Sequence, residues 1–226
     1  TETGVSTGIF TGSIALDEAL AFNGDGILQV NKGDKLTCTY IDPMGDFGIE
    51  ETVTDIAFYR ITLKSGTLST SQTWAKDDSP YLITGDVTVN ENKTLTIEAG
   101  SVVYVSVNDD QSGGDDSNRS ELIIRGSLVA EGAETDSIVF ISSSETPQSE
   151  DWYGIRVTTN SDDYWAVSSA TLKYCRIEHN VNGIHAKGDI GWDNGDTYFI
   201  RIEHSLFQNG GTALYHNSGS YRNVYF

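Results

Sequence analysis

The chain has 226 residues, enough for one large domain or two modest ones, and its 14 Lys and Arg residues against 33 Asp and Glu residues give a formal net charge of −19. Because nucleic-acid affinity depends on basic residues that neutralise phosphates, this charge predicts no DNA or RNA partner. No run approaches the roughly 18 apolar residues of a membrane span, so no insertion into a membrane is expected.

The local patterns favour strands throughout. Val, Ile, Thr and Tyr dominate short apolar runs that are separated by Gly, Asn, Asp and Ser, as in β-rich proteins. The best helical candidate, residues 14–22, is short and runs into the turn residues Asn23–Gly26. We therefore expect an all-β chain.

Residues 1–62 read as a first domain of short strands at 8–16, 26–30, 35–41 and 53–62. Alternation at Leu36, Cys38 and Tyr40 predicts one inward face of an antiparallel sheet. Cys38 and Cys175 both lie in apolar strand patterns, so we expect two buried free thiols.

Within this domain, Phe10–Ile14, Asp25–Val30, Gly33–Thr37 and Tyr40–Pro43 together resemble Ig-like sandwich repeats of bacterial surface proteins. The resemblance implies a small antiparallel β-sandwich. Since a sandwich of this kind needs about seven strands and four or five are visible, the domain is expected to be truncated.

Residues 66–226 carry a repeat. Successive members of one apolar series are 27, 31, 29 and 30 residues apart, and two further pairs, Leu172 with Ile202 and Ile177 with Phe207, are each 30 apart. A competing register of 25 residues, from Arg176–His179 to Arg201–His204, leaves Ile184 without a partner. A period near 29 predicts a solenoid whose inward row is Ile97, Ile124, Ile155, Ile184 and Leu214.

The sequence of this repeat resembles the opening turns of right-handed parallel β-helix proteins of the pectin-lyase-like superfold. The segments that carry the resemblance are 81–89, 95–103, 122–132, 137–140 and 152–155. The resemblance implies a right-handed parallel β-helix over 66–226, which we expect to continue beyond Phe226. It does not fix a function, because the superfold hosts lyases, hydrolases, adhesins and passive stalks.

Catalytic motifs are incomplete, and we assign no catalytic residue. A polygalacturonase-like reading would need Gly-His-Gly and Arg-Ile-Lys, which do not occur; Asp162-Asp163 lies in a polar loop. A pectate-lyase-like reading would need a basic residue beside aspartate-bound Ca²⁺. Arg156, Arg176 and Arg201 are strand positions, and the last two precede Glu178 and Glu203 by two residues, which favours charge pairs on the outer surface over catalysis.

Three loops could bind ligands. Residues 108–117 bring together Asp109, Asp110, Asp115 and Asp116, which are candidate Ca²⁺ ligands, although the Gly-Gly also suits a solvated loop. Asp189, Asp193 and Asp196 form a weaker candidate, and the four histidines lack metal-ligand spacing. Tyr164, Trp165 and Trp192 lie in loops of successive turns and could stack on sugar rings, or could fold back over the helix surface.

The leading hypothesis is a non-catalytic structural or adhesion module of a large exported or cell-surface protein. Its expected partners are a polysaccharide or surface glycan and neighbouring domains of the same polypeptide. The alternative is a polysaccharide lyase or glycoside hydrolase whose catalytic residues lie partly outside this sequence.

Overall fold

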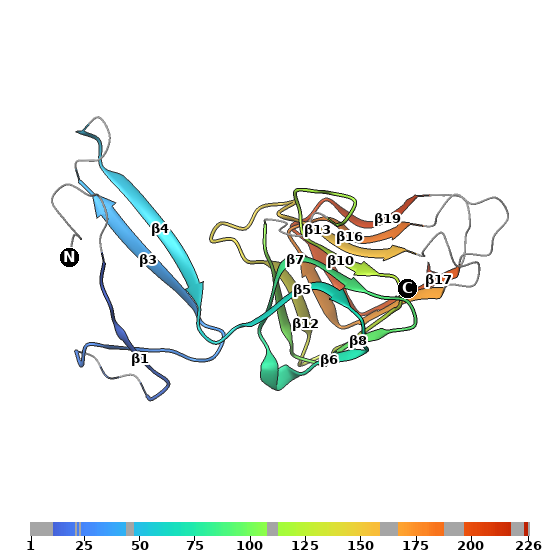
Figure 1. Cartoon of the computed structure of the whole chain (residues 1–226), viewed down its shortest axis with the longest axis horizontal. Coiled ribbons are helices and arrows are strands. Elements are labelled where there is room, and N and C mark those ends of the chain that lie inside the picture. The colour runs from blue at the N-terminus through green and yellow to red at the C-terminus, as the bar shows by residue number, and fades with distance from the viewer. Residues whose placement is uncertain are drawn as a thin grey trace. The chain divides into compact units, whose positions relative to one another are not determined.

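A computed structural model describes residues 11–20, 22, 24–43, 48–107, 113–158, 167–187, 197–217 and 224–225 (Figure 1). The chain divides into two compact units, residues 1–60 and 61–226. Within the described ranges, no helical segment has the length and apolar character that a membrane crossing requires.

The first unit contains two strand pairs in its described part. β1 (Ala15–Asp17) pairs in parallel with β2 (Ile27–Gln29), and β3 (Lys35–Asp42) pairs antiparallel with β4 (Glu51–Phe58). The predicted inward face is wrong at two of its three positions, since Cys38 is exposed and Tyr40 is 40% exposed. The physical reason is that no second layer of described residues covers the two-stranded sheet formed by β3 and β4. The Ig-like sandwich remains a prediction.

The second unit is a parallel β-helix, as predicted. Each full coil contributes three strands in a fixed order. The first strands of successive coils are β7 (Tyr81–Val89), β10 (Glu121–Ile124), β13 (Trp152–Thr158), β16 (Asn180–Lys187) and β19 (Thr212–Asn217). The second strands are β8 (Thr94–Ile97), β11 (Ser127–Glu131), β14 (Val167–Lys173), β17 (Thr197–Glu203) and β20 (Val224–Tyr225). The third strands are β9 (Val102–Val105), β12 (Ile138–Ser142), β15 (Cys175–Glu178) and β18 (Leu206–Gln208).

Equivalent strands of neighbouring coils pair in parallel. First and third strands, together with β5, form one ten-stranded sheet, joined where β7 pairs with β9 (Figure 1). Second strands, together with β6, form a six-stranded sheet. β5 (Thr62–Leu68) and β6 (Gln72–Trp74) precede the first full coil and pair with β7 and β8, with a short 3-10 helix, Lys76–Asp78, after them. One face of every strand lines the interior, which explains why apolar residues alternate along β8, β9 and β12.

The predicted repeat is confirmed in the last coils. Ile155 pairs with Ile184, and Ile184 pairs with Leu214. The two companion pairs, Leu172 with Ile202 and Ile177 with Phe207, are also in register. Arg176 pairs with Leu206 and Arg201 with Thr171, so the 25-residue register does not form.

The first two members of the predicted row are wrong. Ile124 pairs with Val157, so Leu122 is the residue that pairs with Ile155. Ile97 is a residue of the second-strand row and pairs with Ala130. The error arises because long connections lengthen the earlier coils, which breaks the constant period. The predicted residues nevertheless share one apolar core, with Leu214 packed against it.

Candidate functional site

Polar side chains gather on the outer face of the first-strand row, where the neighbouring residues of each strand point into the core. Asp86 comes from β7, Glu121 from β10, Arg156 from β13 and His185 from β16. They are nevertheless buried, with exposed fractions of 6% or less. Charged groups on the outside of a sheet are buried to this extent only when another segment covers them.

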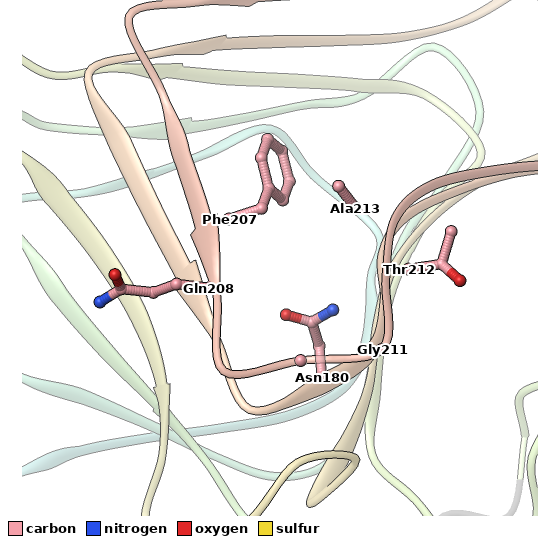
Figure 2. Close-up of a pocket in the computed structure, with 7 residues that line it drawn as sticks. Asn180, Phe207, Gln208, Gly211, Thr212 and Ala213 are labelled. Atoms are coloured by element: carbon pink, nitrogen blue, oxygen red, sulfur yellow. The ribbon is translucent and has the colours of Figure 1, made fainter.

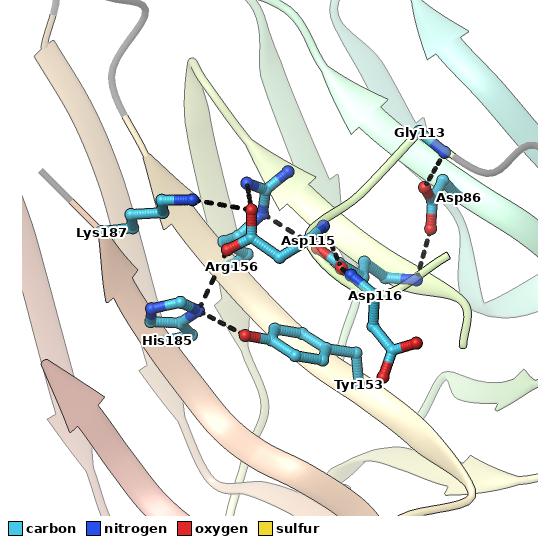
Figure 3. Close-up of polar contacts among 9 residues, drawn as sticks. Asp86, Gly113, Asp115, Asp116, Tyr153, Arg156, His185 and Lys187 are labelled. Atoms are coloured by element: carbon cyan, nitrogen blue, oxygen red, sulfur yellow. Dashed lines mark hydrogen bonds and ion pairs between the residues drawn. The ribbon is translucent and has the colours of Figure 1, made fainter. Parts of the chain in front are cut away.

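Residues 113–117, here called the strap, contribute to that cover (Figure 3). Their backbone is held by carboxylates of the sheet. The amide of Gly113 donates to Asp86 at 2.9 Å, and the amides of Asp115 and Asp116 donate to Oε1 of Glu121 at 2.6 and 2.9 Å. A Cβ at Gly114 would lie 2.3 Å from the Glu121 carboxylate, so any larger residue there would have to displace that carboxylate. The strap is therefore fastened to two coils through its backbone.

Arg156 and Lys187 neutralise the carboxylates beneath and within the strap. Nη1 of Arg156 donates to Oδ1 of Asp115 at 2.8 Å, and Nε of Arg156 lies 2.9 Å from Oε2 of Glu121. Nζ of Lys187, two residues beyond His185 on β16, donates to the same Oδ1 of Asp115 at 2.8 Å. Two cations and two carboxylates thus meet across three consecutive coils.

Tyr153 and His185 complete the cluster. The Tyr153 hydroxyl and Nδ1 of His185 are hydrogen-bonded at 2.8 Å, and the same Nδ1 lies 3.7 Å from Oδ2 of Asp115. Burial lowers the pKa of His185 to about 4, against the opposing charge of Asp115. Burial and the nearby charges of Asp115 and Glu121 raise the pKa of Tyr153 to about 12. Both side chains are therefore neutral at pH 7.

The two carboxylates of the cluster differ in their acidity. Burial raises the pKa of Glu121 to about 7, although the charge of Arg156 opposes the rise. Burial also tends to raise the pKa of Asp115, but the hydrogen bond from Lys187 and the charges of Arg156 and Lys187 outweigh it, so this pKa is lowered. Glu121 consequently exchanges a proton near neutral pH, while Asp115 stays ionised.

The predicted calcium ligands are only partly within the described residues. Asp115 is bound by Arg156 and Lys187, and the Asp116 carboxylate pairs with Arg119 at 2.5 Å. Asp109 and Asp110 lie outside the described residues. Among the residues that the structure describes, no group of three or more His, Cys, Asp or Glu side chains is arranged to hold a metal ion. Calcium binding remains a prediction.

The predicted sugar-stacking residues Tyr164, Trp165 and Trp192 lie outside the described residues, as do Asp162, Asp163, Asp189, Asp193 and Asp196. Both predicted charge pairs form: Nε of Arg176 lies 3.0 Å from Glu178, and Nη2 of Arg201 lies 2.5 Å from Glu203. The prediction of a surface pair is confirmed for Arg201 with Glu203, but Glu178 is buried. The prediction that both thiols are buried holds for Cys175 alone.

A small cavity lies near the last described coil, between β18 and the start of β19 (Figure 2). Its volume is about 70 Å³. Pockets that enclose a drug-sized ligand have roughly 300 Å³ or more, so this cavity is too small for a sugar ring bound in the same way. Its lining consists of Asn180, Phe207, Gln208, Gly210, Gly211, Thr212 and Ala213.

Sequence reasoning missed most of the outer-face cluster. The sequence patterns predict Arg156 only as a strand position, and they predict no site at Asp86, Glu121 or Tyr153. The available signal was a charged residue at an outward position of an otherwise apolar strand, as in Glu121-Leu-Ile-Ile124 and Gly154-Ile-Arg-Val157. That signal identifies each residue but not its partner.

Comparison with protein families gave one result that covers more than half of the chain. A family model described as a pectate-lyase like beta helix domain matches residues 66–208. Neither the curated proteins nor the solved structures gave a match.

Proposed function

The chain belongs to the pectate-lyase like beta helix domain family, and we propose that it serves as a non-catalytic module of an exported or cell-surface protein, where it has a structural and adhesive role and contacts glycans. The observation that carries the proposal is the self-neutralised cluster on the outer face of the β-helix. The groups best suited to acid–base chemistry there are already bound to one another.

A base that removes a proton from a sugar has to reach that sugar. The Arg156 side chain is only 8% exposed and is shared between Asp115 and Glu121, and the Glu121 side chain is fully buried. Asp115 is paired with Arg156 and Lys187, and Glu121 lies against Arg156. This arrangement supports a structural role, since a paired and buried network fixes the strap and the register of three coils.

Glycan contact is supported by two features. The family takes its description from an enzyme type that acts on a polysaccharide. The sequence pattern predicts that Tyr164, Trp165 and Trp192 lie in loops of successive turns. Aromatic rings bind sugars by stacking without any need for a catalytic group.

The test is binding of the full chain to immobilised acidic and neutral polysaccharides. Trp165→Ala and Trp192→Ala are expected to weaken retention by about tenfold. Phe199→Ala is the matched control, because Phe199 is 41% exposed on β17 and belongs to no predicted site. Equal retention of all three variants, or no binding by the wild type, would overturn glycan contact through these loops.

One observation favours a second candidate, a polysaccharide lyase or glycoside hydrolase. Glu121, Arg156 and Lys187 converge from three consecutive coils, and the pKa of Glu121, raised to about 7, suits proton transfer at neutral pH. This function would require the strap to leave the cluster. Release of unsaturated or reducing-end products by the wild type, abolished by Glu121→Gln, would establish it.

A further inference from the structure

The Asp115 carboxylate is bound by two cationic side chains, as the carboxylate of an external ligand would be. One of its oxygens accepts hydrogen bonds from Arg156 on β13 and Lys187 on β16, both at 2.8 Å. The other oxygen faces Nδ1 of His185 at 3.7 Å. The two cations come from neighbouring coils and converge on a single anionic group, which the strap supplies (Figure 3).

This convergence differs from the other charge pairs of the β-helix. Arg176 with Glu178 and Arg201 with Glu203 each lie on one strand, two residues apart. Lys173 also approaches Glu203, but its Nζ lies 4.0 Å from the other carboxylate oxygen, whereas Arg156 and Lys187 both donate to one oxygen of Asp115 at 2.8 Å. In a chain with a net charge of −19, two cations aimed at one point create a local site for an anion. Arg156 is buried and fixed, whereas Lys187 is 39% exposed, so the site is open to solvent on the Lys187 side.

The strap does not depend on this carboxylate for its attachment. Its backbone is held by Asp86 and Glu121 through the amides of Gly113, Asp115 and Asp116. Rotation of the Asp115 side chain would therefore free the two cations without detaching the strap. Because the oxygen that accepts both hydrogen bonds belongs to a carboxylate, another carboxylate can replace it with the same contacts.

We propose that Arg156 and Lys187 form a binding site for a carboxylate group from outside the chain, and that Asp115 occupies this site and competes with the external ligand. The site accepts an anion and discriminates against a neutral sugar, which cannot neutralise the two cations. Occupancy by Asp115 reduces the apparent affinity to the intrinsic affinity multiplied by the fraction of molecules in which the site is free. This inference does not depend on glycan contact through the aromatic loops.

Calorimetric titration of the full chain with sodium glucuronate tests the proposal, with sodium acetate as a second carboxylate and glucose as the neutral control. Asp115→Asn should bind glucuronate at least about tenfold more tightly than the wild type, because the competing anion is gone. Asp116→Asn is the matched control from the same strap, and it should bind as the wild type does. Adding Lys187→Met to Asp115→Asn should abolish the gain. If Asp115→Asn increases the affinity for glucuronate and for acetate by similar factors, the site recognises the carboxylate alone. A larger increase for glucuronate would show that the site also contacts the sugar ring.

The proposal is overturned if Asp115→Asn gains no affinity, if Asp116→Asn gains as much, or if glucose binds equally well. A measurement on the wild type covers the case in which Asp115→Asn fails to fold. The pKa of Asp115, followed by carbon NMR of its carboxylate, should rise toward its ordinary value as glucuronate displaces it from the two cations. An unchanged pKa at saturating glucuronate and acetate would contradict the proposal independently.

Discussion

Nε of Arg156 on β13 lies 2.9 Å from Oε2 of Glu121 on the neighbouring strand β10, and the Glu121 side chain is completely buried. The contact joins consecutive coils on the outside of the β-helix, at positions where a solenoid normally presents its surface to water. A buried charge depends on its partner, so this pair should be far more sensitive to substitution than the exposed pairs.

Arg156→Met should destabilise the β-helix by about 3–5 kcal/mol, because it leaves Glu121 buried without its counter-charge. Arg201→Met is the control, since Arg201 is exposed and its pair should contribute about 1 kcal/mol or less. Denaturant unfolding of both variants measures the difference. Equal costs would show that the buried pair is no more important than a surface pair.

The stability of the β-helix should depend on the ionisation of Glu121. Its pKa is about 7 in the folded chain against an ordinary value of 4.5, so the folded state holds the proton more tightly than the unfolded state. The contribution of Glu121 to stability is therefore present below pH 4.5 and is lost as the pH rises to 7, by on the order of 3 kcal/mol. Unfolding of the wild type and Glu121→Gln across this range isolates the effect. A difference between them that does not change with pH would refute it.

His185 acts in the opposite direction and serves as an internal comparison. Its pKa is about 4 in the folded chain against an ordinary value of 6.5, so the unfolded state binds the proton more tightly. Stability linked to His185 is present above pH 6.5 and is lost as the pH falls toward 4. His185→Gln should therefore flatten the acid side of the stability profile while leaving the Glu121 effect in place.

Ile155→Ala should cost about 2–5 kcal/mol, as expected for deletion of a fully buried aliphatic side chain. Ile155 stacks between Leu122 and Ile184 in the first-strand row and is 0% exposed. Leu206→Ala on β18 is the control, since Leu206 is 51% exposed. Comparable costs in chemical denaturation would mean that the row is not packed as described.

Calcium binding by the 108–117 loop should raise the melting temperature by mass action. Melts in calcium and in chelator are the measurement, with Asp109→Asn and Asp110→Asn expected to remove the shift. An identical melting temperature in both conditions would exclude the prediction.

The register of the β-helix could be predicted from the sequence only where consecutive coils have nearly the same number of residues. Ile155, Ile184 and Leu214 could be aligned because successive members of this row are 29 and 30 residues apart, so the last coils have nearly equal length. Ile97 and Ile124 could not be aligned in this way, because longer connections follow them and change the residue spacing from one coil to the next. The inward assignment of Tyr40 failed for a different reason: alternation predicts a face but does not supply the layer that would cover it.

The outer-face cluster was beyond sequence reasoning because its contacts are distant along the chain. Asp115 and Lys187 are 72 residues apart, and Arg156 and Asp115 are 41 apart. Pairing them requires the register of three coils and the path of the strap, neither of which the apolar period encodes. Two local signals are present in the sequence, a charge within an apolar strand and a Gly-Gly before Asp115. Each indicates one residue of such a contact, but neither indicates the residue that it binds.

The most direct test of a non-catalytic module is to incubate the full chain with acidic and neutral polysaccharides while binding and product release are measured together. Wild type and Asp115→Asn should both be followed, because the variant removes the group that occupies the two cations. We predict that polysaccharide is retained and that neither protein releases unsaturated or reducing-end products. Product release by either protein, lost on Glu121→Gln, would contradict the account and assign the cluster to catalysis.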